Sequence, residues 1–232
     1  MKPKSLKLLV LGRGKTGALV AGVARERGHQ VVVLGSEENA EALALTKDLL
    51  RGFDVVIDFT TPQAVMANIE ACAKAGASIV VGTTGWYDRM ERVRKLVEKS
   101  GIGFVFGANF SVGVNLFFEI ARSAASAVGR GYDGRILERH HVHKKDAPSG
   151  TAAALRNVVK DASGAELPIQ SEREGEVVGY HELVLESSSD TITLVHNARS
   201  RRGFAEGAVG AAGWLAGRKG FYDFKDVWRD LR

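Results

Sequence analysis

Short apolar runs alternate with longer amphipathic stretches along the first half of the chain. The apolar, often β-branched runs predict strands that are buried on both faces. These strands are expected at Lys7–Leu11, Val31–Leu34, Val55–Asp58, Ser78–Val81 and Gly103–Phe106. Helices are expected between them at Gly17–Arg27, Gln63–Lys74 and Asp88–Lys99. This alternation is typical of βαβ units, so the first half predicts an α/β fold with a Rossmann-type, doubly wound parallel sheet.

The pattern changes after Asn115, because strands and helices no longer alternate strictly. The segments expected to be helical are Leu116–Ala127, a helix from Ser149, Ala205–Gly217 and Phe224–Leu231. The expected strands are Asp133–His141, Glu182–Glu186 and Thr191–His196. This order predicts a second, α+β domain with an open mixed sheet. We therefore expect one domain over residues 1–112, a second over 113–205, and a return of 206–232 to the first domain.

The composition is that of a globular protein. Of 232 residues, 45% are apolar and 25% charged, and the 27 glycines follow no fixed period. No apolar stretch approaches the roughly 18 residues of a membrane span, and the run Leu8–Leu11 is too short for a signal peptide. Cys72 is the only cysteine, which favours a reducing compartment. We therefore expect a cytoplasmic protein without a membrane partner.

The positive net charge raises the question of a nucleic-acid partner. The chain has 32 basic and 27 acidic residues, a formal charge of +5. Most charges are dispersed, and two compact basic clusters occur at Arg139–Lys145 and Arg199–Arg202. Nucleic-acid-binding proteins usually concentrate charge in a stripe or tail, often with stacking aromatic residues. Compact clusters fit a small polyanion at least as well, so no nucleic-acid partner is expected.

A glycine-rich loop follows the first predicted strand. Its sequence, GRGKTG at residues 12–17, matches G-x-G-x-x-G and opens the first predicted helix. Such a loop brings backbone N–H groups and a helix N-terminus against a pyrophosphate. A P-loop would need a glycine where Leu9 stands, and a turn selected only for close packing is the other alternative. We expect the whole loop to bind a dinucleotide: Gly12, Arg13, Gly14, Lys15, Thr16 and Gly17.

The end of the second predicted strand bears on the choice between NADH and NADPH. In many dinucleotide-binding domains an acidic residue here binds the ribose hydroxyls of NADH. Glu37 could provide that carboxylate. Ser36, with Lys15 or Arg13 nearby, could instead bind the 2′-phosphate of NADPH. These cations slightly favour NADPH, and both cofactors stay open.

Two further polar loops follow the fourth and fifth predicted strands. They read Gly82-Thr83-Thr84-Gly85 and Gly107-Ala108-Asn109-Phe110-Ser111. Open α/β sheets bind ligands at the carboxyl ends of their strands, and small residues there let a ribose lie against the backbone. Ordinary turns are the alternative. We expect both loops to lie near the cofactor.

A cluster of histidines follows in the second half. His140, His141 and His143 lie within four positions, and Lys144 comes next. If the strand continued to His143, alternation would put His141 and His143 on one face. A metal site using His-x-His lacks an acidic or cysteine ligand at a convincing spacing, and a solvated cationic face is a further alternative.

A site for a dicarboxylate substrate is the third reading of this cluster. Lys144 supplies a fixed cation, and one histidine can give or take a proton. Pro148 and Ser149 mark a helix start, so the N–H groups of Gly150 and Thr151 are oriented toward an anion. A basic strand end close to a helix N-terminus can clamp a carboxylate.

The stretch ERHHVHKKDAPSGTA at residues 138–152 resembles a motif of the 4-hydroxy-tetrahydrodipicolinate reductase (dihydrodipicolinate reductase) family of bacterial lysine and diaminopimelate synthesis. The resemblance extends, in the family's order, over nearly the whole chain. The matching segments are Asp58–Pro62, Gly82–Gly85, Asn109–Asn115, Ser200–Arg201 and Phe204–Ala205.

The resemblance implies roles for matching residues. His140 would give or take a proton and Lys144 would be a second proton donor, while His141, Gly150 and Thr151 would hold the substrate carboxylates. Ser149 is placed with this substrate-binding group. Residues implied to contact NADH or NADPH are Gly82, Thr83, Thr84, Gly107, Ala108, Asn109, Phe110 and, beside them, Arg201.

The resemblance also implies the reaction and the assembly. The reaction would be NAD(P)H-dependent reduction of 4-hydroxy-tetrahydrodipicolinate by a homotetramer built through the open sheet of the second domain. Another NAD(P)-dependent two-domain dehydrogenase, such as an amino-acid dehydrogenase, is the alternative. It would keep the glycine loop without needing Lys144 beside Ser149-Gly150-Thr151.

Overall fold

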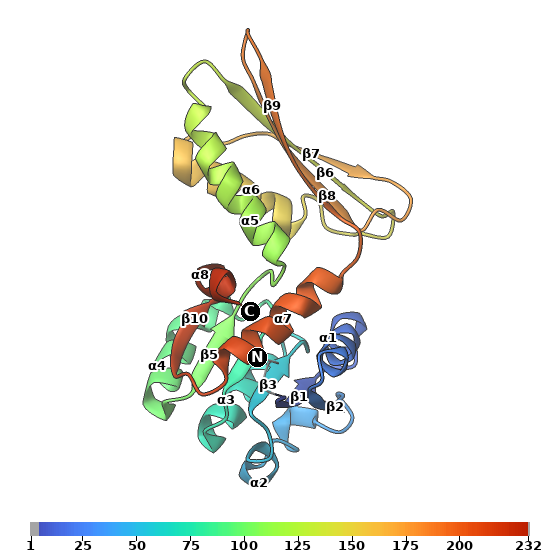
Figure 1. The fold of residues 1–232 in the computed structure, drawn as a ribbon, viewed down its shortest axis with the longest axis vertical. Coiled ribbons are helices and arrows are strands. Elements are labelled where there is room, and N and C mark those ends of the chain that lie inside the picture. The colour runs from blue at the N-terminus through green and yellow to red at the C-terminus, as the bar shows by residue number, and fades with distance from the viewer. Residues whose placement is uncertain (1–4, 232) are drawn as a thin grey trace. The chain divides into compact units, whose positions relative to one another are not determined.

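The computed structural model describes residues 5–231, which form two compact units (Figure 1). The first contains the chain up to Val112 and again from Arg202 onward. The second contains Gly113–Arg201. The return to the first unit thus starts at Arg202, slightly before the residue 206 expected from the sequence. Every helix within residues 5–231 is too short or too polar to cross a bilayer.

The first unit is built on a parallel sheet of six strands. They are β1 (Lys7–Leu11), β2 (Gln30–Leu34), β3 (Val55–Asp58), β4 (Ile79–Val81), β5 (Gly103–Phe106) and β10 (Gly220–Asp223). Their order is β10-β5-β4-β3-β1-β2, and all pairs are parallel. The chain reverses direction of travel across the sheet at β1, so the Rossmann-type, doubly wound prediction is confirmed.

Helices cover both faces of this sheet. They are α1 (Lys15–Glu26), α2 (Lys47–Leu50), α3 (Val65–Ala75), α4 (Met90–Ser100), α7 (Arg202–Leu215) and α8 (Phe224–Val227), with short 3-10 turns at Ala40–Ala42, Tyr87–Arg89 and Trp228–Asp230. Leu8 and Val10 of β1 point into a core shared with α1 and α7. Leu9 and Leu11 point into the opposite core, with α3 and α4. The two-residue period of β1 therefore builds a core on each side.

The second unit is an open mixed sheet with two helices on one face (Figure 1). Its elements are α5 (Val112–Ala124), a 3-10 turn at Ala125–Ala127, β6 (Asp133–His140), α6 (Gly150–Ser163), β7 (Ile169–Arg173), β8 (Gly179–Glu186) and β9 (Thr191–Ala198). The strand order is β7-β6-β8-β9, with β6 and β7 parallel and the other pairs antiparallel. Phe117 and Leu155 from the helices pack on Ile136 and Leu183 of the sheet. The predicted open mixed sheet is confirmed.

Several boundaries differ from the sequence pattern. The strands β7 and β10 were not expected, because β7 is polar along most of its length and both are short edge strands. β6 ends at His140, so His141 and His143 do not continue its alternation. The helix expected at Phe224–Leu231 is only α8 followed by a 3-10 turn.

Gly207 of α7 provides a test of close packing in the first unit. A Cβ at this position would lie 1.7 Å from the carbonyl oxygen of Phe110. Gly207→Ala should therefore lower the free energy of unfolding by about 2 kcal/mol or more, measured by urea unfolding. Gly213 lies in the same helix and has open space around a Cβ. Gly213→Ala should be neutral or stabilising by up to ~1 kcal/mol, and equal effects of the two variants would contradict this packing.

Candidate active site

The glycine loop connects β1 to α1, as predicted. Gly12 has φ +103°, and a Cβ there would lie 2.2 Å from the carbonyl oxygen of Phe59. A Cβ on Gly17 would lie 2.1 Å from the carbonyl oxygen of Gly12. These two glycines are therefore required by the protein's own packing, independently of any ligand.

Gly14 is different, because a Cβ there would meet no protein atom within 4 Å. Gly14 is also the N-cap of α1, where no side chain caps the helix and the first turn carries no acidic residue. The first N–H groups of a helix have no partner within the helix and attract anions. The loop therefore leaves open space and unpaired donors at one point, which fits the pyrophosphate of NADH or NADPH.

A cavity of about 310 Å³ joins this loop to the ends of neighbouring strands. Its lining brings together Gly14, Lys15 and Thr16 with Gly82, Thr83 and Thr84. Phe59, Thr60 and Pro62 complete it. Two of the three loops predicted to hold the cofactor therefore meet in one cavity of the first unit.

The buried carboxylate of Asp58 accepts hydrogen bonds from residues that line this cavity. Asp58, at the end of β3, is 0% exposed. Its Oδ1 accepts hydrogen bonds from the Thr83 hydroxyl at 2.6 Å and from the Thr60 hydroxyl at 2.8 Å and N–H at 3.0 Å. Its Oδ2 accepts from Asn68 of α3 at 2.7 Å. Asp58 therefore holds two lining threonines in place.

The loop after β5 divides into a surface part and a core part. Ala108 is exposed and Asn109 half-buried. Phe110 is 2% exposed and packs against Phe224 with ring centroids 4.5 Å apart. A Cβ on Gly107 would lie 2.9 Å from Phe224. The ring of Phe110, one of the residues expected to contact the cofactor, packs in the core, so the part of the loop at the surface is Ala108 and Asn109.

Glu38 is the acidic residue after β2 that contacts the glycine loop, and the sequence interpretation missed it. Its carboxylate accepts the Gly35 N–H at 2.9 Å and pairs with Arg13 of the glycine loop. Ser36 and Glu37 are exposed in the following turn. The side chain of Arg13 is 58% exposed in this pair. A carboxylate and a cation therefore stand together where the adenine ribose of a dinucleotide would lie.

The second unit carries the residues predicted to bind substrate. Lys144 follows β6, and its Nζ lies 2.8 and 2.9 Å from the two carboxylate oxygens of Asp146. Nη2 of Arg201 lies 3.5 Å from Nε2 of His141. Arg201, expected to approach the cofactor, is thus placed beside the predicted substrate residue His141. A group of cations surrounds the end of β6.

The N-terminus of α6 lies beside these cations. The hydroxyl of Ser149 accepts the Ala152 N–H at 3.2 Å and lies 3.2 Å from Nε2 of His181. Ser149 is only 2% exposed, and its side chain caps the helix. Gly150 and Thr151 are exposed or half-exposed in the first turn, which carries no acidic residue. Their N–H groups can receive an anion.

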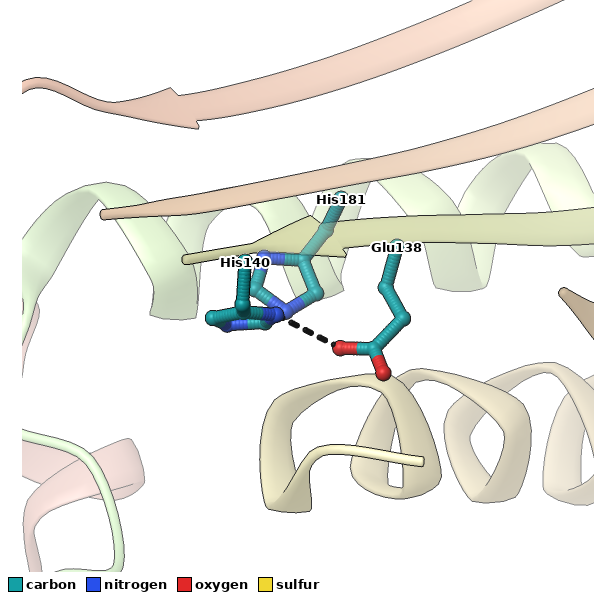
Figure 2. A group of neighbouring side chains, drawn as sticks. All are labelled: Glu138, His140 and His181. Carbon is teal, nitrogen blue, oxygen red and sulfur yellow. Dashed lines mark ion pairs between the residues drawn. The ribbon is translucent and has the colours of Figure 1, made fainter. Parts of the chain in front are cut away.

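His140 is held within a buried polar cluster (Figure 2). Its Nδ1 lies 2.8 Å from Oε2 of Glu138, which is 0% exposed. His181 of β8 faces His140 edge-to-face, with ring centroids 5.1 Å apart. Oε1 of Glu138 accepts the Ser149 N–H at 3.1 Å and lies 3.4 Å from both terminal nitrogens of Arg173. The sequence interpretation missed Glu138, His181 and Arg173.

These surroundings shift the pKa values of both histidines. Burial lowers the pKa of His140 below its ordinary value, and Lys144 and Arg173 lower it further, while Glu138 opposes them. Burial and the charge of His140 lower the pKa of His181 to about 4. His181 is therefore neutral near pH 7, and His140 is the histidine of the pair that gains a proton first.

The ligand atoms of Glu138, His140 and His181 all lie within 4.8 Å of one another, which is close enough to hold a metal ion. The nearby Arg173 guanidinium already compensates the carboxylate. Arg173 would repel a divalent ion at the same carboxylate more strongly than a singly charged imidazolium, so the cluster favours a proton over a metal ion. The His-x-His pair considered from the sequence is not part of this group.

Both halves of the chain match models of one protein family. Residues 6–110 match the N-terminal part of dihydrodipicolinate reductase, and residues 113–228 match its C-terminal part. The chain belongs to the dihydrodipicolinate reductase family. The resemblance stated from the sequence is therefore confirmed. The chain is an NAD(P)H-dependent oxidoreductase, and its cofactor is NADH or NADPH, as expected.

Individual members of the dihydrodipicolinate reductase family align over nearly their whole length. The 4-hydroxy-tetrahydrodipicolinate reductase of Christiangramia forsetii is 36% identical, over 97% of this chain and 99% of the relative. That of Anaeromyxobacter dehalogenans is 37% identical, over 95% and 92%. The dipicolinate-bound dihydrodipicolinate reductase of Paenisporosarcina sp. TG-14 has the same fold, with a TM-score of 0.81, 21% identity and coverage of 97% and 100%. The alternative of an amino-acid dehydrogenase is not needed.

Gly14 allows a direct test of the pyrophosphate site. Because its Cβ position is open to protein but adjoins the α1 N-terminus, Gly14→Ala should weaken NADPH and NADH binding by about tenfold or more while changing the unfolding midpoint little. Gly22→Ala in the same helix, where a Cβ also meets nothing within 4 Å, is the matched control. Binding is measured by fluorescence titration, and unchanged affinity in Gly14→Ala would contradict the assignment.

The neutral state of His181 predicts acid sensitivity. The unfolded chain binds a proton on this side chain below about pH 6.5, and the folded protein only below about pH 4. Stability should therefore fall as pH drops from 6.5 to 4, by up to ~3 kcal/mol from this group. His181→Gln should flatten the pH dependence of the urea midpoint over this window. His143→Gln, at a residue whose side chain is 76% exposed, should not.

Proposed function

We propose that this chain reduces 4-hydroxy-tetrahydrodipicolinate to tetrahydrodipicolinate with NADH or NADPH, in lysine and diaminopimelate synthesis. The reaction named for the relatives supports this. The observation that carries it is the second unit's combination of a buried, carboxylate-paired His140 with cations and a helix N-terminus. This combination fits a cyclic substrate that carries two carboxylates and accepts a proton during the reaction.

The first unit binds and orients the cofactor in this proposal. The N-terminus of α1 at Gly14 holds the pyrophosphate, and Arg13 with Glu38 lies at the adenine ribose. Thr83 and Ala108 lie at the strand ends that border the nicotinamide side. The bound cofactor supplies the hydride.

The second unit binds the substrate carboxylates and manages the proton. The N–H groups of Gly150 and Thr151 hold one carboxylate, with His141 and Arg201 beside it. His140 donates the proton that neutralises charge developing on the ring, and Lys144 stabilises that charge. Asp146 orients the Lys144 ammonium at 2.8 Å. Because the substrate carries its own carboxylates, it can take over this role from Asp146 when it binds.

The oligomer proposed is a homotetramer assembled through the open sheet. Both described helices of the second unit pack on the face that carries Ile136 and Leu183. The opposite face carries Leu137, Val184 and Val195, of which Val195 is 49% exposed and Val184 is buried at 4%. Apolar residues on an uncovered sheet face favour association with a second copy.

The proposed location is the cytoplasm, with no nucleic-acid or membrane partner. Cys72 is buried and unpaired, and its 0% exposure leaves it inert toward solvent. A reductase that draws on NADH or NADPH belongs where those cofactors are maintained. Lys144 and Arg201, one from each basic cluster, belong to the proposed substrate site.

His140→Gln tests the proton-donor assignment. Removing the acid should lower kcat by roughly 10²–10⁴-fold and change KM far less, because carboxylate binding is retained. Turnover is followed by NADPH and NADH oxidation with freshly prepared substrate. His143→Gln, in the same cluster but exposed, should keep kcat within twofold of the unsubstituted protein's, roughly the scatter for an exposed site. A near-normal kcat in His140→Gln would refute the role.

A further inference from the structure

Glu138 is a buried acidic residue that pairs with His140 and touches neither substrate nor cofactor in the proposed reaction. It lies two residues before His140 on β6, so both side chains point to the same face of the sheet. Its side chain is 0% exposed, and the His140 side chain is 9% exposed. An ionised carboxylate this deeply buried is costly unless charges and donors compensate it.

The two carboxylate oxygens of Glu138 serve different partners. Oε1 accepts the Ser149 N–H and faces the Arg173 guanidinium. Oε2 lies 2.8 Å from Nδ1 of His140, and neither of these two atoms has another partner among the described residues. The oxygen lies off the direction of the ring N–H, so the contact is not a linear hydrogen bond and becomes an ion pair when His140 is protonated. Charge attraction tolerates this geometry, since it depends mainly on distance.

We propose that Glu138 is the positioning residue and counter-ion of His140, holding the imidazolium by Nδ1 so that Nε2 carries the proton to the substrate. The inference rests on the proposed function, because it assumes that His140 is the proton donor. Glu138 itself touches no substrate in this role. It acts only through the imidazole ring.

The surroundings of His140 leave Nε2 free for this task. Nε2 has no hydrogen-bond partner among residues 5–231. Gly179 lies opposite on β8, where a Cβ would come within 3.3 Å of Nε2. The ring of His181 packs edge-to-face on His140 and is itself anchored by Ser149. The carboxylate of Glu138 therefore holds the imidazole at Nδ1, and the ring of His181 packs against it. Nε2 remains available to donate its proton to the substrate.

Each element around His140 contributes to its charge balance. Glu138 on β6 and Asp146 in the following loop favour the imidazolium, while Arg173 on β7 and Lys144 disfavour it. His181 on β8 and its neighbour His196 on β9 both have pKa values lowered by burial, and are neutral near pH 7. Glu138 is first among the groups that raise the pKa of His140. Without Glu138, burial and the charges of Lys144 and Arg173 would lower the pKa of His140, and only the exposed Asp146 would oppose them.

The proton step balances without any further reactant. As hydride reaches the ring carbon, the Nε2–H proton passes to the substrate, and His140 becomes neutral imidazole. The 4-hydroxyl leaves as water with a hydrogen of the neighbouring ring carbon, and the hydride and the proton together then reduce the double bond that this loss creates. Nδ1 keeps its proton toward Glu138, which remains a carboxylate throughout, and Nε2 regains a proton from solvent before the next turnover.

Glu138→Gln tests the proposal because it keeps the shape of the side chain and removes its charge. Loss of the counter-ion lowers the pKa of His140, so kcat should fall about 10–100-fold at pH 7.5. The alkaline fall of kcat should move about one pH unit lower. KM for substrate should change less than about threefold, and NADPH affinity should not change. Glu166→Gln, a surface carboxylate paired with Lys160, is the control and should match the parent enzyme.

Arg173→Gln is a second test, in which the pKa of His140 should shift in the direction opposite to that in Glu138→Gln. It can be measured even if Glu138→Gln folds poorly. Removing this cation raises the pKa of His140, so the alkaline limb should move to higher pH. The pKa of His140 is also read directly by nitrogen-15 NMR of the imidazole. If His140→Gln is impaired while both variants keep the parent pH profile, the Glu138 proposal is overturned and the reductase assignment stands. A near-normal His140→Gln would instead remove the proposed proton donor.

A metal ion is the remaining alternative for this cluster, and the same enzyme preparation decides it. Dialysis against EDTA should leave kcat unchanged, because the cluster is occupied by a proton and an arginine. Loss of activity on dialysis, with recovery on adding Zn²⁺, would overturn the counter-ion role of Glu138.

Discussion

The charge of Glu138 must be compensated inside the protein, and the substrate-side cluster is arranged around that need. An ionised carboxylate removed from water costs several kcal/mol unless fixed partners replace the water. Here the partners are a guanidinium from β7, the helix N–H of Ser149 and the ring of His140. Each comes from a different element, so β6, β7 and α6 must be correctly packed before the cluster forms. The same requirement gives His140 one defined orientation, which a general acid needs.

Asp58 has the same physical role in the first unit. It is fully buried at the end of β3, and its carboxylate oxygens accept hydrogen bonds from Thr60, Thr83 and Asn68. These bonds connect the ends of β3 and β4 to α3 beneath the loop that lines the cofactor cavity. In both units a buried carboxylate accepts hydrogen bonds from polar loops at the end of a strand. In both networks the carboxylate itself is fully buried beneath the polar groups that it holds.

The cofactor-binding and substrate-binding residues differ in how their positive charge is compensated. The glycine loop offers oriented N–H groups and open space without a protein anion at Gly14. The substrate side instead pairs its cations with protein carboxylates, as Lys144 with Asp146 shows. Such pairs keep cations ordered in the free enzyme, and a dianionic ligand can replace the internal partner. The net charge of +5 is therefore less informative than the positions at which the cations gather.

Local sequence determined the parallel sheet, the glycine loop and the order of motifs, because periods of two and 3.6 residues and the glycine spacing are local properties. It also placed Glu138 and His140 on one face of a strand, a signal that could have identified Glu138. Only the tertiary structure brought His181 and Arg173 to that pair, since strand pairing across the sheet joins residues more than 30 positions apart. It also assigned Phe110 and Ser149 to packing and capping, because burial depends on distant neighbours such as Phe224 and His181. The sequence determined which chemistry was present, and the packing of distant strands decided which groups surround His140.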